Sequence, residues 1–427
     1  MAIRNLASAL GAAALLVLAM LAFTAVVLRQ TPLATTTGAV DPATGANTVT
    51  AIDLDERRPV QLQALTREDD MACPPAEASA PALELWQLPC RRLFYSQAYR
   101  DTTGNDALPA LLYHNNEGSG LADNFAGSVS LFAMALMHRR RFYLSYDVLD
   151  LGVVRPNFPR WNWTEPLPPI SNDTLGIGYD TLENRTAVLL AANDTNLVAL
   201  RTNRGALTYS FKHDTPLARF LRNELGLSVH TAFACLHSAL YGVLPPLFTV
   251  GDAATVLNTL LTTHKLRIGI QIRTGDAAFK YKADGTGKSS TWSYSSTVDT
   301  YVRCALRVAA EAGEPAPVLF LVTDNVLVRK HFADMQVPDG VERLLATQNP
   351  VKHVSFAVSP SADWESMTMG VAEHTLLSMV DYWVVTFGSG FGLTAAARSV
   401  RSDGRVYDGV RCSKLDVYAM GMTRAGI

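Results

Sequence analysis

Strong charge of either sign and metal-binding cysteine patterns are both missing from this chain of 427 residues. Its formal net charge is only −2, which argues against a nucleic-acid partner and against binding to a strongly charged membrane surface. The five cysteines show no CxxC or Cys/His spacing, so nothing predicts a zinc site. Glycine and proline are not unusually frequent, so we expect most of the chain to fold. With 48% hydrophobic residues, it can bury a large core divided among about two or three domains.

One long run without charge, Leu6–Leu28, lies near the N-terminus between Arg4 and Arg29. A transmembrane helix needs about 20 apolar residues, whereas the apolar core of a cleaved signal peptide has about 7 to 15. The amino group and Arg4 favour a cytoplasmic tail at residues 1–5, although Arg29 weakens the charge difference. We therefore expect a signal anchor over residues 6–28 and a single-pass type II membrane protein. A cleaved signal peptide is the alternative, and it delivers the chain to the same compartment.

Two further features agree with a lumenal location. Four Asn-x-Thr sequons without a central proline are acceptors for glycosylation, and they lie at Asn162, Asn172, Asn184 and Asn193. An oxidising lumen also permits disulfides, and Cys73 and Cys90 bracket a proline-rich stretch that they could close. Because five is an odd number, at least one cysteine is free or pairs with another molecule.

A turn with two glycines precedes the first helical pattern. Gly118-Ser119-Gly120 leads into apolar residues at helical spacing, namely Leu121, Phe125, Val129, Phe132 and Leu136. A glycine-rich turn at a helix N-terminus can hold an anion through its backbone N–H groups. The same glycines also suit an ordinary turn, and both interpretations stay open.

Three strands alternate with helices in the second half. The expected strands are Leu266–Arg273, Val318–Val322 and Tyr382–Thr386. In the first of them Ile268, Ile270 and Ile272 share one face, and Gln271 and Arg273 lie on the other. Helical patterns follow each strand, at residues 298–309, 366–379 and 393–399. This alternation is typical of a doubly wound α/β sheet.

Each of these strands ends in a polar turn. The turns are Arg273-Thr274-Gly275-Asp276, Thr323-Asp324-Asn325 and Gly388-Ser389-Gly390-Phe391. Ligands of doubly wound sheets bind beyond the carboxyl ends of the strands. If the strands are neighbours, the three turns line one crevice, and an arginine opposite a glycine-rich helix start suits a nucleoside diphosphate. Taken singly, each turn is also compatible with ordinary loop chemistry.

A family resemblance rests on the same residues. Ile268–Arg273 resembles the first motif of plant-type xyloglucan fucosyltransferases and of the wider superfamily of 1,2-, 1,6- and protein O-fucosyltransferases. Ala372–Asp381 with the following strand and Ser389–Gly392 resembles their last motif, and Gly118–Asp123 is similar to their N-terminal Gly-Leu-Gly-Asn loop. The resemblance covers residues 113–399, in the same order and at plausible spacing.

The resemblance implies a GT-B-like fold, with two Rossmann-like subdomains facing a cleft, and metal-independent, inverting transfer of fucose from GDP-fucose. It implies that Arg273 binds the donor pyrophosphate and that Ser389, Gly390 and Phe391 hold it from the other wall. It also implies that Asp324 contacts the nucleoside, and it places Gly118, Gly120 and Asp123 among the donor-binding residues. Metal independence agrees with the sequence, whose only Asp-x-Asp is Asp53-Leu54-Asp55 in the expected stem.

The chain also departs from the family pattern. Ala122-Asp123 replaces Gly-Asn, with Asn124 directly after it, and the last turn is one residue shorter. These differences concern acceptor geometry more than donor binding, and they leave room for another nucleotide sugar. The general base stays open among Asp276, Asp123 and Glu117, and we list Asp276 beside Arg273 as a catalytic candidate.

The expected organisation follows from these features. A flexible lumenal stem at residues 29–84 precedes an acceptor-side subdomain at 85–250 and a donor subdomain at 251–427. We expect a Golgi glycosyltransferase with no cofactor, whose partners are the nucleotide sugar and a glycan. Transfer to protein or to an N-glycan core, and a catalytically silent glycan-binding protein, are the alternatives.

Overall fold

The computed structural model describes residues 90–105, 107–114, 120–145, 197–201, 206–241, 252–274, 294–348 and 360–417. All of them belong to one compact unit, Leu65–Ile427. The expected anchor, the stem and the four sequons lie outside the described residues, as do Glu117, Gly118 and Asp276. Within the described ranges, no helix combines the length and the apolar character that a membrane span requires.

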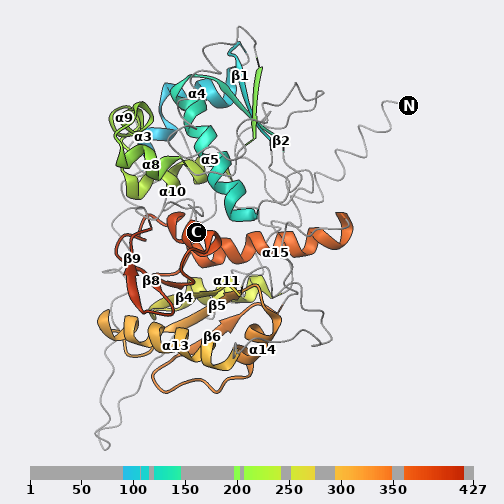
Figure 1. The fold of residues 1–427 in the computed structure, drawn as a ribbon, viewed down its shortest axis with the longest axis vertical. Coiled ribbons are helices and arrows are strands. Elements are labelled where there is room, and N and C mark those ends of the chain that lie inside the picture. Colours follow the sequence, from blue (N-terminus) through green and yellow to red (C-terminus); the bar gives the residue numbers. More distant parts are fainter. Residues whose placement is uncertain are drawn as a thin grey trace, which may run out of the picture. The chain divides into compact units, whose positions relative to one another are not determined.

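A three-stranded parallel sheet forms the first part of the fold. Its strands are β1 (Ala110–His114), β2 (Arg141–Ser145) and β3 (Leu197–Arg201), in the order β2-β1-β3. The helices described in this part (Figure 1) are α3 (Arg91–Phe94), α4 (Gln97–Gly104), α5 (Leu121–Met137), α8 (Leu207–Lys212), α9 (Pro216–Asn223) and α10 (Val229–Leu240).

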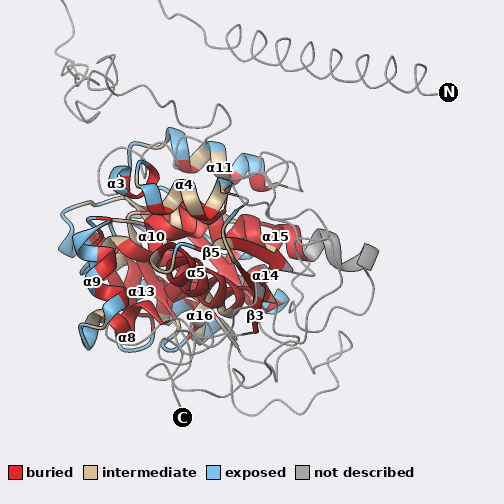
Figure 2. Ribbon diagram, turned by 90° about the horizontal axis from the view of Figure 1, so that it is seen from above, coloured by how far each residue is buried: buried red, intermediate tan, exposed pale blue. Residues whose placement is uncertain are grey.

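Helix α5 is buried along almost its whole length (Figure 2). The sequence predicts a helix with one apolar stripe, but the intervening positions are small residues such as Ala126, Ser128 and Ala133, and these are buried as well. Helices α4, α9, α10 and α16 (Gly390–Ala397) and strands β1 and β2 all pack against it. A helix that is apolar on every side is a core helix, so α5 packs at the centre of these elements.

A six-stranded sheet forms the second part, in the order β6-β5-β4-β7-β8-β9. Its strands are β4 (Arg267–Ile272), β5 (Val318–Thr323), β6 (Arg343–Ala346), β7 (Tyr382–Val385), β8 (Val406–Asp408) and β9 (Ser413–Leu415). All neighbouring pairs are parallel except β8 and β9. The accompanying helices are α11 (Ala253–Thr262), α13 (Tyr294–Glu311), α14 (Val326–Asp334), α15 (Pro360–Ser378) and α16.

The two faces of this sheet pack against different helices. Ile268, Ile270 and Ile272 of β4 pack with residues of α13 and α14 in one core cluster. Phe320 and Trp383, on the other face, join the core that contains α5, α10, α15 and α16. The three predicted strands are confirmed as β4, β5 and β7, and the alternation predicted for β4 is confirmed too. α15 begins earlier than predicted, at Pro360.

Two disulfides join segments far apart in the sequence. Cys90 at the start of α3 bonds to Cys235 in α10, and Cys304 in α13 bonds to Cys412 after β8. The predicted pair Cys73–Cys90 is therefore wrong. The folding of α10 onto α3 brings Cys235 against Cys90, a contact between residues 145 apart in sequence that sequence spacing does not reveal.

Candidate functional site

The strand order of the larger sheet reverses between β4 and β7. From β4 the chain proceeds outward through β5 to β6, and it then returns to β7 on the other side of β4 and proceeds to β8. In doubly wound sheets the ligand crevice lies outside the carboxyl ends of the strands at such a reversal. The two strands that meet here are followed by Arg273 and by Thr386, so topology points to the turns that the sequence predicts.

The backbone of Arg273 is bound directly to the end of β7. Its N–H donates to Thr386 Oγ1 at 2.9 Å, and Thr386 in turn donates its N–H to the Gln271 carbonyl at 3.0 Å. The Tyr301 hydroxyl from α13 lies 2.9 Å from the same Thr386 Oγ1. Burial raises the pKa of Tyr301, opposed by its Thr386 bond, so this phenol stays neutral and serves as a structural hydrogen-bonding group. The Arg273 side chain is half-buried.

Asp324 lies beside Arg273 at the end of β5. Its Oδ1 accepts hydrogen bonds from the Thr274 N–H at 2.9 Å and from the Thr274 hydroxyl at 3.1 Å. Asn325 caps α14 by accepting from the N–H groups of Leu327 and Val328. Asp324 is therefore held against the residue that follows Arg273, as expected if the three turns share one crevice.

Asp381, which directly precedes β7, pairs with Arg267. Arg267 at the opposite end of β4 binds it with two guanidinium nitrogens, at 2.9 Å and 2.7 Å. Burial tends to raise the pKa of Asp381, but its hydrogen bonds and charge interaction with Arg267 lower it below the ordinary value. This pair stabilises the amino edge of the sheet, away from the predicted crevice.

The turn between β7 and α16 carries the remaining predicted donor residues. Ser389 donates its N–H to the Thr386 carbonyl at 3.0 Å, and Gly388 adopts a positive φ of 71°, a conformation that favours glycine. Ser389 is the N-cap residue of α16, yet its side chain makes no cap bond. Its exposed fraction is only 2%, and its Oγ has no hydrogen-bond partner among the described residues.

That serine has the features of a ligand-binding group. An N-cap serine ordinarily accepts a hydrogen bond from the first turn of its helix, and a buried hydroxyl without a partner costs free energy. The first-turn N–H groups of α16, including those of Gly390 and Phe391, also lack acceptors within the helix. Together they form a site where a phosphate can be bound by a hydroxyl, backbone N–H groups and the helix dipole.

Close packing holds α16 in this position. A Cβ atom added to Gly392 would lie 2.8 Å from Gln271 Oε1 and 2.9 Å from Val385 Cγ1. Only a residue without a side chain lets the helix approach β4 and β7 this closely. Gly269 of β4 allows a similarly close approach of α15, because an added Cβ there would lie 2.5 Å from Leu377 Cδ1.

A buried histidine joins α15 to the first turn of α16. Arg398 Nη1 lies 2.9 Å from His374 Nδ1, and His374 Nε2 lies 2.9 Å from Thr394 Oγ1. Thr394 donates to the Gly390 carbonyl at 2.8 Å, and the Phe391 ring meets the His374 ring edge-on with centroids 4.9 Å apart. His374 therefore positions two of the predicted donor-binding residues.

The N-terminal candidates lie close to the same histidine. Phe125 of α5 has its ring centroid 5.2 Å from that of His374, and Gly120 is the N-cap of α5, with Asp123 in its first turn. Asn124 is buried and accepts a hydrogen bond from the Tyr113 hydroxyl at 3.0 Å. Asn124 therefore supports β1, and the half-buried Asp123 is the described acidic candidate in this turn.

Several residues of this region escape prediction from sequence. They are Thr386, Tyr301, Thr394 and Arg398, together with Asp408 and Arg411 at the end of β8. Thr386 directly precedes the predicted turn, so its position is a signal that could have been used. Tyr301 and His374 fall on the buried faces of predicted helices, and their polar contacts become visible only in three dimensions.

Comparing the sequence with known proteins and comparing the structure with solved structures give different results. No protein-family model matches the sequence, and no curated protein matches it. Among solved structures, an arginine-to-lysine mutant of Arabidopsis thaliana FUT1 in complex with GDP is similar with a TM-score of 0.49 and 13% identity, over 82% of this chain and 85% of that one. NodZ alpha-1,6-fucosyltransferase co-crystallised with GDP is similar with a TM-score of 0.41 and 12% identity, over 70% and 95%. The NodZ structure soaked with GDP-fucose has a TM-score of 0.38 and 13% identity, over 68% and 93%.

Proposed function

We propose that this chain is an inverting, metal-independent glycosyltransferase that transfers fucose from GDP-fucose to a hydroxyl group of a glycan. The observation that carries this proposal is the convergence of three turns at the switch point of the larger sheet. Arg273 follows β4, Ser389 lies in the turn after the neighbouring β7, and Asp324 follows β5 on the other side of β4. We further propose a GT-B-like arrangement in which the three-stranded sheet with its helices supplies the acceptor side.

The chemistry assigns a role to each group at the crevice. The acceptor oxygen attacks C1 of the fucose, the bond from C1 to the diphosphate oxygen breaks, and negative charge develops on the departing GDP. A guanidinium donates two parallel hydrogen bonds to phosphate oxygens, and Arg273 would stabilise that charge most strongly in the transition state. The Ser389 hydroxyl and the N-terminal N–H groups of α16 would bind the same diphosphate from the β7 side.

The proton of the acceptor hydroxyl requires a base. Asp123 is the candidate within the described residues, because it lies in the first turn of α5, two residues before Phe125, whose ring contacts that of His374. Asp276 and Glu117 are the other candidates. Substitution of each by its amide separates them, since the true base should lose transfer activity and retain GDP binding.

The proposed location is the Golgi membrane, with a type II anchor at residues 6–28 and glycans on the four sequons. Two disulfides within the globular part support delivery to an oxidising compartment.

Nucleotide binding tests the proposal first. GDP should raise the melting temperature of the protein more than UDP or CMP, because a ligand at 100 times its Kd adds about 2.7 kcal/mol of stability. The GDP effect should persist in EDTA, which tests metal independence. Equal shifts with the three nucleotides, or none, would contradict a GDP-fucose donor.

Arg273 then tests the site. Arg273→Lys retains the charge but loses the planar fork, so we expect transfer to fall on the order of 100-fold while the melting temperature is kept. Arg273→Ala should lose more. Full transfer activity in either variant would remove Arg273 from the site, and unfolding of Arg273→Ala would indicate a structural role instead.

A further inference from the structure

Beside the predicted crevice lies a small exposed patch formed by Phe387, Val410 and Arg411. Phe387 is 54% exposed and Val410 is 65% exposed, and the Arg411 side chain is 79% exposed. The Arg411 guanidinium carbon lies 6.0 Å from the centroid of the Phe387 ring. We call these three residues the β7–β8 platform, because they follow the ends of two neighbouring strands.

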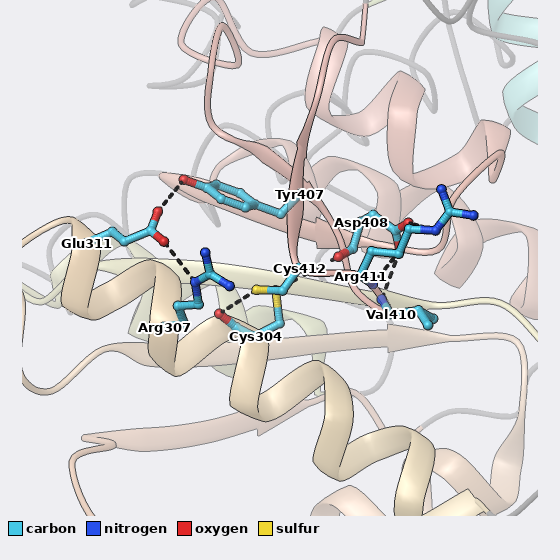
Figure 3. Close-up of a disulfide and its surroundings, with 8 residues drawn as sticks. All are labelled: Cys304, Arg307, Glu311, Tyr407, Asp408, Val410, Arg411 and Cys412. Atoms are coloured by element: carbon cyan, nitrogen blue, oxygen red, sulfur yellow. Dashed lines mark hydrogen bonds and ion pairs between the residues drawn. A yellow bond between two sulfur atoms is a disulfide. The ribbon is translucent and has the colours of Figure 1, made fainter.

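The turn that carries Val410 and Arg411 is held in place by several contacts. Buried Asp408 accepts hydrogen bonds from the N–H groups of both residues, at 2.9 Å and 3.3 Å. The disulfide between Cys412 and Cys304 attaches the turn to α13 (Figure 3). Arg411 Nε lies 3.9 Å from Asp408 Oδ2, and the rest of the Arg411 side chain is exposed. The exposed side chains are therefore presented by an anchored backbone.

Tyr301 links this turn to the crevice. Gly409 approaches the Tyr301 ring so closely that an added Cβ would lie 2.1 Å from it. The hydroxyl of the same tyrosine lies 2.9 Å from Thr386 Oγ1, the atom that accepts from the Arg273 N–H. Phe387 follows Thr386 directly. The platform is thus continuous with the Arg273 site, on the side of β4 opposite to Asp324.

The chemistry of the platform suits a saccharide. The face of an aromatic ring packs against the apolar C–H face of a sugar, and a guanidinium supplies up to five donors to ring and hydroxyl oxygens. Exposed aromatic and arginine side chains on a rigid backbone are also the usual anchors of binding surfaces.

We propose that the β7–β8 platform binds one sugar of the acceptor oligosaccharide, in addition to the acceptor contacts proposed for the three-stranded part, with that sugar ring packed on Phe387 and its hydroxyls bonded to Arg411. This assignment rests on the proposed function, because it takes the neighbouring crevice to hold the donor diphosphate. The strand order then places nucleoside contacts on the β5 side and acceptor contacts on the β8 side of Arg273.

The test compares Phe387→Ala and Arg411→Ala with Val337→Ala, a matched control that shortens another exposed hydrophobic residue, 53% exposed. GDP affinity is measured by calorimetry, and binding of the GDP-loaded full-length protein to a printed array of neutral oligosaccharides is measured in parallel. Because the substituted side chains are exposed, all three variants should fold, which the melting temperature verifies.

We expect the two platform variants to bind their array ligands roughly tenfold more weakly, the loss of one good contact, with GDP affinity unchanged. A fall in GDP affinity would overturn the assignment by making Phe387 a nucleobase contact. Array binding equal to that of Val337→Ala, or wild-type protein that binds GDP but no oligosaccharide, would overturn it too. Wild-type protein that binds no GDP would instead refute the proposed function, and the platform assignment with it.

Discussion

Acidification should destabilise this fold through two buried histidines. His374 has no exposed surface and His237 is 3% exposed. An arginine can only donate, so the Arg398 contact at 2.9 Å makes His374 Nδ1 an acceptor, and the ring proton belongs on Nε2, facing Thr394. Protonation of Nδ1 would set two cations against each other. Burial lowers the pKa of His374 well below 6.5, and the charge of Arg398 lowers it further.

The same causes act on His237. Burial is the main reason why its pKa is well below 6.5, and charge interactions with Arg398 and His374 lower that pKa further. In the unfolded chain both histidines bind a proton below about pH 6.5, whereas in the folded protein they stay neutral, so the unfolded state binds more protons. The free energy of unfolding must therefore fall as the pH falls. Between about pH 7.5 and 5.5 the loss is about 1.4 kcal/mol for each histidine, or about 2.7 kcal/mol for both.

Urea unfolding at several pH values measures this loss. The His237→Phe variant is the informative comparison, because His237 Nε2 has no hydrogen-bond partner among the described residues and its ring packs among Phe125, Phe233 and Tyr241. We expect the variant to keep its stability near pH 7.5 and to lose only about half as much on acidification. A wild-type stability that stays constant down to pH 5.5, or an undiminished loss in His237→Phe, would refute this reasoning.

Three other predictions concern packing, a buried ion pair and topology. Gly392→Ala should lower the free energy of unfolding by about 1 to 3 kcal/mol through overpacking, and it should weaken GDP binding. Gly370 lies in a helix with open space around an added Cβ, so Gly370→Ala should raise the free energy of unfolding by about 1 kcal/mol. Equal melting temperatures of the two variants would contradict this. Glu373→Ala should lower the free energy of unfolding, measured in urea, by about 3 to 5 kcal/mol, because it leaves the buried Arg329, 2.7 Å away, without its carboxylate. Adding Arg329→Met to the same chain should restore the lost stability, which checks this cause. Glycosidase treatment of protein from a glycosylating host should lower its apparent mass, and the protein should stay in the membrane fraction; an unchanged mobility or a secreted product would contradict the lumenal or the anchored topology.

Much of the larger sheet could be predicted from the sequence because its strands are locally encoded. β5 is a continuous apolar run and β4 alternates, and each ends at a polar turn. Those patterns reflect burial on two faces, which is a property of each strand alone. The candidate residues Arg273, Asp324 and Ser389 could be chosen for the same reason, since each directly follows a readable strand.

Other features depend on contacts that no local pattern contains. The partner of Cys90 is Cys235, which only the packing of α10 against the α3–α4 region brings near it. The packing of α5 could not be anticipated either, because small residues such as Ala126 and Ser130 fit a solvent face and a crowded core equally well. His374 looked like one more position in a helix, and its bonds to Arg398 and Thr394 need α15 and α16 to lie side by side.

Local sequence patterns and three-dimensional contacts are both needed to locate the candidate site. The order of strands along the chain is β4, β5, β6, β7, and from that order alone β7 could pair with β6 as readily as with β4. Pairing with β6 would put β7 three strands from Arg273, and Ser389 could not share a phosphate with it. The observed pairing of β7 with β4 is favoured by Gly269 and Gly392, which let α15 and α16 pack closely against β4 and β7. The two glycines, which carry no chemistry of their own, are thus a physical reason why Arg273 and Ser389 follow neighbouring strands.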